Sequence, residues 1–109
     1  MERLSHKAKC FNGVLKKLNP RGYVLIRIGK TWVEEHRLCC ENILNRLLEK
    51  NEVVHHINFI HNDNRPENLA LFESVKAHSH WHRQFKQFGA TRPLLAEIEK
   101  RKILNLRSL

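Results

Sequence analysis

The sequence has few cysteines and none of the cysteine motifs that are typical of structural zinc sites. Its three cysteines, Cys10, Cys39 and Cys40, form no C-x-x-C pair. Their odd number, in a chain without an apolar signal-peptide segment, favours free thiols and a reducing, intracellular setting. Cys39 and Cys40 lie in a segment with helical apolar spacing, so we expect them to fill the core.

Long hydrophobic runs and internal repeats are also missing. No apolar run approaches the roughly 20 residues that a membrane helix needs, so we expect a cytoplasmic protein without membrane contact. With 109 residues, of which 41% are hydrophobic, the chain can bury one modest core. Residues 1–109 are therefore predicted to form a single domain.

Acidic residues are scarce at both ends of the chain. Residues 1–30 carry eight Lys or Arg against one acid, residues 83–109 carry seven against two, and residues 31–82 carry five against eight. The net charge of +9 thus comes from the flanks. Basic flanks favour a polyanionic partner, because neutralised phosphates release counterions, and DNA is the leading candidate. A basic surface that serves only solubility is the alternative.

The first half of the chain predicts a basic arm, a strand pair and a helix. Residues 1–20 lack a clear period and form the arm. The β-branched run Gly22–Ile28 predicts a strand paired with a short neighbour at Thr31–Val33. Thr31 and Glu34 match the T-x-x-E capping box, and the apolar spacing that follows predicts a helix from about Val33 to Leu47.

The second half predicts the order strand, loop, strand, helix. Val53–Ile57 reads as a short strand, Asn58–Pro66 as a loop, and Leu69–Phe72 as a second short strand. Ser74 can cap a helix from Val75 to about Phe88.

A last amphipathic helix is predicted within residues 89–109, where Leu94–Leu106 resumes helical spacing. Its apolar stripe is a surface through which the chain could form a homodimer.

Six of the eight histidines fall between positions 55 and 82. His78 and His82 are four residues apart, so they share a helix face and can chelate one ion, while His80 projects elsewhere. His55 and His56 are adjacent on a strand and must point to opposite faces. One of them can therefore join a metal while the other stays free.

This pattern resembles a known family. His55-His56, then Asn68 and Leu69, then His78-x-x-x-His82 resembles the HNH (ββα-metal, His-Me finger) endonucleases, in particular the compact phage and bacterial members. The likeness is close over residues 53–82. It implies an α+β fold with a ββα-metal core in residues 22–88, including an N-terminal strand pair and helix, and a C-terminal helical extension. The chain lacks the C-x-x-C zinc motifs that brace many members.

The resemblance also implies roles for individual residues. His56 corresponds to the general base, and Asn68 to the residue that orients it, with Asn64 as a second candidate. The metal ligands would be three histidines: His55, His78 and His82. Independently, a neutral imidazole with a pKa of about 6.5 can take a proton from water near pH 7 if an acceptor holds its other nitrogen.

Three neutral imidazoles leave an open position on one divalent ion, as in catalytic sites. Zinc is the first candidate, with Mg, Mn, Ni or Co as ions that could support activity. The family implies hydrolysis of double-stranded DNA to a 5′-phosphate and a 3′-hydroxyl. The alternative is a non-catalytic zinc-containing nucleic-acid-binding module, although structural zinc usually has four protein ligands. Arg65, Arg83 and Lys86 lie beside the centre in sequence and could bind the DNA backbone or form a solvated face.

Overall fold

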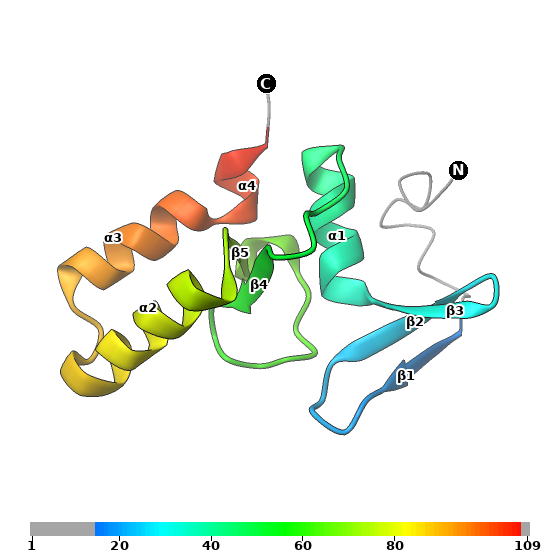
Figure 1. Cartoon of the computed structure of the whole chain (residues 1–109), viewed down its shortest axis with the longest axis horizontal. Coiled ribbons are helices and arrows are strands. Elements are labelled where there is room, and N and C mark those ends of the chain that lie inside the picture. Colours follow the sequence, from blue (N-terminus) through cyan, green and yellow to red (C-terminus); the bar gives the residue numbers. More distant parts are fainter. Residues whose placement is uncertain (1–14, 108–109) are drawn as a thin grey trace.

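Two small antiparallel sheets and several helices give the chain an α+β fold (Figure 1). The structure is a computed structural model, and it describes residues 15–107. Residues 1–14 of the expected basic arm lie outside the described residues.

The first sheet has three strands in the order β1 (Lys16–Leu18), β2 (Val24–Ile28) and β3 (Thr31–Glu34). The strand expected over Gly22–Ile28 is confirmed. Assigning Lys16–Leu18 to the arm was wrong, because this segment pairs with β2, with Lys16 opposite the fully buried Ile26.

The capping box expected at Thr31 was also wrong. Thr31 lies in β3 rather than at a helix start, and its hydroxyl donates to the Ile28 carbonyl in the β2–β3 turn. Pairing of Val33 with Ile26 outweighs the local capping motif. Trp32, on the other face of the sheet, lies under the Lys17 ammonium, 4.3 Å from its ring centroid.

Helix α1 (Glu35–Leu44) is therefore shorter at both ends than expected. Glu34 precedes its first turn without a side-chain cap, and Asn45 ends it in the left-handed conformation with φ 58°. Leu47, expected inside the helix, is exposed. Cys39 and Cys40 pack into the core as predicted: Cys40 is buried, and burial raises the pKa of both thiols, that of Cys39 to about 12, while Cys10 lies outside the described residues.

The second sheet pairs β4 (Val53–His56) with β5 (Leu69–Phe72), close to the predicted bounds, and lies between helices on both faces (Figure 1). On one face, Val54 packs with Leu71 against α1. On the other, Phe72 packs against the helices that follow. Each strand is thus buried on both sides, and adjacent residues of β4 enter different environments.

Helix α2 (Val75–Phe88) has the predicted bounds, and the Ser74 hydroxyl accepts from the Ala77 backbone N–H as its cap. The prediction of a single helix over Leu94–Leu106 was wrong, because the helix is interrupted. The chain instead forms α3 (Arg92–Arg101) and α4 (Ile103–Leu106), separated by an extended Lys102.

The break at Lys102 has a structural cause. Lys102 forms an isolated bridge with Ala70 at the edge of β5, which turns the chain so that Ile103 enters the core beside Cys40. Most of the apolar stripe therefore packs within the chain. Self-association stays a prediction, with Leu95 and Leu106 as the exposed apolar residues of this segment.

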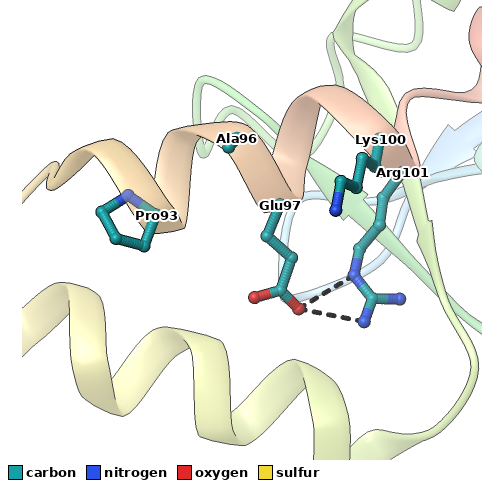
Figure 2. A pocket seen from close by; sticks show the side chains of 5 residues that line it. All are labelled: Pro93, Ala96, Glu97, Lys100 and Arg101. Atoms are coloured by element: carbon teal, nitrogen blue, oxygen red, sulfur yellow. Dashed lines mark hydrogen bonds and ion pairs between the residues drawn. The ribbon is translucent and has the colours of Figure 1, made fainter.

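A groove of about 640 Å³ runs along α3, and Figure 2 shows the side chains that line it. Arg101 is held there by Glu97 at 2.9 Å and by Glu73 at 2.6 Å, and it lies over the Phe72 ring. Arg101 thus attaches α3 to β5 and to the residue that follows it.

Replacing Ile103 with alanine tests the break in the C-terminal helix. Because Ile103 is fully buried in the core around β4 and β5, Ile103→Ala should lower the free energy of unfolding by about 2–5 kcal/mol. Leu106→Ala, at a position 42% exposed, should cost much less. Denaturant unfolding measures both, and equal losses would contradict this packing.

Candidate metal centre

Three histidine side chains from β4 and α2 converge at one point. His55 Nδ1 lies 3.0 Å from His78 Nε2, which in turn lies 3.0 Å from His82 Nε2. One ring nitrogen of each residue lies within 4.8 Å of the other two. The structure thus brings the three predicted ligands close enough together to hold a metal ion.

The protonation state of the three rings suits metal binding. Burial, reinforced by the neighbouring His78 and His82, lowers the pKa of His55 to about 3. Burial likewise lowers the pKa of His78 to about 4 and that of His82 below its usual value. All three rings are therefore neutral at pH 7, which is the form that binds metals. Nitrogens on one tetrahedral zinc ion are about 3.3 Å apart, so the 3.0 Å spacings need little adjustment.

Aromatic packing orients the most buried ligand. His55 is 2% exposed, and its ring lies edge-on to Trp81, with centroids 4.9 Å apart, and to Phe72. Its Nε2 is enclosed without a hydrogen-bond partner among residues 15–107. Packing and the Nδ1 contact with His78 therefore orient this ring, and the Trp81 indole N–H donates to the Leu94 carbonyl on α3.

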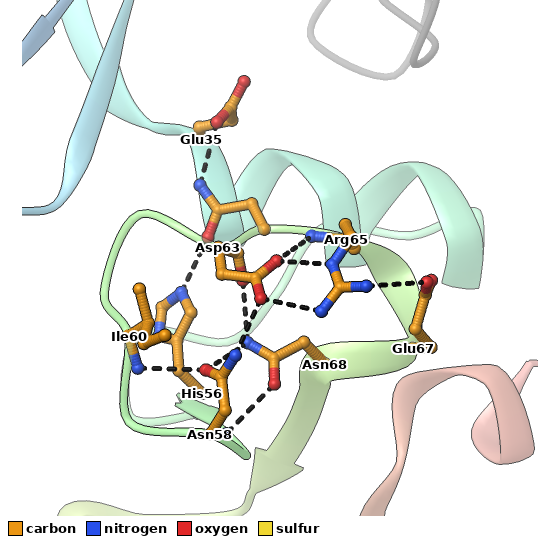
Figure 3. Close-up of polar contacts among 9 residues, drawn as sticks. Glu35, His56, Asn58, Ile60, Asp63, Arg65, Glu67 and Asn68 are labelled. Carbon is orange, nitrogen blue, oxygen red and sulfur yellow. Dashed lines mark hydrogen bonds and ion pairs between the residues drawn. The ribbon is translucent and has the colours of Figure 1, made fainter.

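His56 points to the opposite face of β4, where a chain of polar contacts determines its tautomer (Figure 3). Its Nε2 lies 2.6 Å from Asn64 Oδ1, and Asn64 Nδ2 donates to Glu35 Oε1 at 2.8 Å. Because the Glu35 carboxylate only accepts, the amide must turn its oxygen to His56. His56 therefore carries its proton at Nε2 and keeps a lone pair at Nδ1.

The buried Glu35 carboxylate is balanced by a cation from the first sheet. Lys16 Nζ lies 3.0 Å from Glu35 Oε2, so both carboxylate oxygens have partners. Burial lowers the pKa of His56, while its bond to Asn64 opposes this shift. Glu35 is thus linked to the His56 ring through the Asn64 amide.

Asn68 does not contact the His56 ring in the way expected of an orienting residue. Its Oδ1 accepts from the Asn58 backbone N–H at 3.0 Å, and its Nδ2 donates to Asn58 Oδ1 and to the Asp63 carbonyl. The buried Asn68 amide thus closes the β4–β5 loop on itself (Figure 3). Asn64, the second candidate, holds the ring instead, and Asn68 acts on it only through the loop.

The two histidine groups open into one pocket of about 50 Å³. Besides the four histidines of the predicted centre, its lining includes Tyr23, Phe59 and His61. Tyr23 was missed by sequence reasoning because it comes from the turn just before β2, far from the histidines in the chain. His61 is one of the six clustered histidines, but no local pattern indicated its place in the pocket.

The predicted DNA-binding cations differ in their surroundings. Arg65 forms two bonds to Asp63, at 2.8 and 2.9 Å (Figure 3). Arg83 lines a different pocket, together with His80. Lys86 is exposed one helical turn after His82, so it lies on the same face of α2 as the metal ligands. Of the three predicted cations, Lys86 is the one that shares the helix face of His82.

Comparisons with protein-family models, with curated proteins and with solved structures found no match to this chain. Among the described residues, none of the helices has the length and apolar character needed to cross a membrane.

Removing one ligand should abolish tight metal binding. His78 lies between the other two nitrogens, so His78→Ala should weaken zinc or cobalt binding by more than the roughly 10–100-fold expected when a neighbouring supporting residue is lost. Isothermal titration of the metal-free chain measures this. His80→Ala, on another face of α2, is the matched control and should keep wild-type affinity. Equal affinities for the two variants would refute the site.

The tautomer of His56 can be observed directly. Long-range ¹H–¹⁵N spectra of the metal-free chain should show a neutral His56 ring protonated at Nε2. Asn64→Ala removes the acceptor and should produce a mixture of tautomers. The exposed Asn62 supplies the control, since Asn62→Ala leaves the polar chain intact. A wild-type ring protonated at Nδ1 would contradict the assignment.

Proposed function

We propose that this chain is a metal-dependent DNA endonuclease of the HNH type. The observation that supports this best is a single pocket in which three neutral imidazoles lie at metal-ligand spacing while His56, on the same strand, has its tautomer determined by Asn64. The order β4, loop, β5 and α2 agrees with the strand, loop, strand, helix order of the ββα-metal core.

The triad would hold one divalent ion and leave a position for substrate, as catalytic sites with three protein ligands do. When bound, the ion would supply Lewis-acid stabilisation of the negative charge on a phosphate group. Imidazole ligands suit zinc, manganese, nickel or cobalt, whereas magnesium prefers oxygen ligands and fits this donor set least well.

His56 acts as the general base in this proposal. Its Nδ1 takes a proton from a water molecule, whose oxygen forms a bond to phosphorus as the bond from phosphorus to the 3′ oxygen breaks. The 3′ oxygen then takes a proton from solvent, which gives a 5′-phosphate and a 3′-hydroxyl. Glu35 favours the protonated ring through Asn64, because its carboxylate lies behind the amide that accepts the Nε2 proton.

Double-stranded DNA is the substrate that the charge of the chain favours. The net charge is +9, and phosphate contacts convert such charge into salt-dependent affinity. Lys86 would contact a phosphate next to the one that is cut. Arg65 would have to exchange its Asp63 partner for a phosphate, and Arg83 would reach DNA only at a distance from the centre.

Cleavage of supercoiled plasmid tests the proposal. The purified chain should nick the plasmid with a suitable divalent ion and not with EDTA. His56→Ala should lower the rate about 10²–10⁴-fold, the range for losing a general base, without changing metal affinity. His80→Ala should cut like the wild type. DNA ligase should reseal the nicks directly, because they carry a 5′-phosphate and a 3′-hydroxyl.

A non-catalytic zinc-containing module would behave differently in the same experiment. It would bind metal and DNA, cut nothing with any ion, and lose neither property in His56→Ala. That result would reject the endonuclease while keeping the metal site.

A further inference from the structure

His61 lies in the β4–β5 loop, and a distant segment of the chain holds its ring. Its Nδ1 lies 2.8 Å from the Arg21 carbonyl oxygen, 40 residues away in sequence. The ring also stacks on Tyr23, with centroids 4.3 Å apart and planes 7° apart. A carbonyl only accepts, so Nδ1 carries the proton and the neutral ring keeps its lone pair at Nε2.

The segment that holds His61 is a well-defined turn. Asn19 Oδ1 accepts from the backbone N–H groups of Arg21 and Tyr23, both at 3.0 Å. The Gly22 N–H donates to the Asn19 carbonyl, and Gly22 has φ +89°, a conformation that other residues rarely adopt. The Arg21 carbonyl is thus presented to His61 at a set position.

His56 and His61 stand side by side in the same pocket, with ring centroids 6.0 Å apart. They are held in complementary ways. The Nε2 proton of His56 is bound by Asn64, and the Nδ1 proton of His61 is bound by Arg21. Each neutral ring is left with one nitrogen lone pair that has no hydrogen-bond partner among residues 15–107.

We propose that His61 accepts a hydrogen bond from the same water molecule that His56 deprotonates. Two lone pairs would then bind the two hydrogens of one water, which directs its oxygen toward phosphorus. During attack one hydrogen moves to His56 Nδ1, while the other stays on the oxygen and keeps its bond to His61 Nε2. This inference rests on the proposed nuclease function and adds a second residue that touches the reacting water.

Three substitutions separate this role from a purely structural one, in which His61 only anchors its loop to Arg21. His61→Asn keeps a polar group near the Nδ1 position and can preserve the bond to Arg21, but it lacks an acceptor at the Nε2 position. His61→Gln reaches the Nε2 position with its amide oxygen. His61→Phe keeps only the stack on Tyr23. His80→Asn, on an exposed residue of α2, is the matched control.

The measurements are kcat and KM for plasmid nicking by the full chain, zinc affinity and thermal unfolding. We expect His61→Asn and His61→Phe to lower kcat about tenfold to a hundredfold, the scale for a misplaced reactant, with little change in KM or zinc affinity. His61→Gln should recover much of the lost rate. The wild-type ring should also be protonated at Nδ1 in long-range ¹H–¹⁵N spectra.

Two results would overturn the inference while leaving the nuclease intact. One is wild-type kcat in His61→Asn. The other is a loss in all three variants, Gln included, that follows their loss of thermal stability. Absence of nicking by the wild-type chain would overturn the proposed function and this inference together.

Discussion

The two-residue period of one short strand is the constraint on which the candidate site depends. Because successive side chains of β4 point to opposite faces of the sheet, His55 lies on the face covered by α2 and His56 on the face covered by α1. Each face is covered by its own set of helices. Two adjacent and chemically identical residues therefore have different surroundings: aromatic rings pack around His55, and a polar chain that ends in a carboxylate holds His56.

The two sides of the sheet organise their histidines by different physical means. On the α2 side, packing against Trp81 orients the His55 ring, and its enclosed Nε2 has no hydrogen-bond partner among the described residues. On the α1 side, hydrogen bonds set the ring of His56, and Lys16 from β1 balances the charge of Glu35. The first sheet thus contributes to the centre although it carries none of the predicted ligands.

Much of the central unit could be predicted from sequence, because its signals are local. The spacing of His78 and His82, the Ser74 cap and the apolar run of β5 all depend on neighbouring residues. The errors arose where pairing and tertiary contacts, rather than local motifs, determine the structure. Thr31 lies in β3 because that strand pairs with β2, and Lys102 interrupts the last helix because it bridges to Ala70. The fold of the β4–β5 loop places Asn64, rather than Asn68, against His56.

The bond from the Trp81 indole to the Leu94 carbonyl has a consequence for how the protein is made. The Trp81 ring packs against His55, yet its hydrogen-bond acceptor belongs to α3, which follows α2 in the chain. During synthesis the ligands emerge from the ribosome before the helix that steadies them. The centre therefore reaches its final packing only after α3 has been synthesised and has docked on α2.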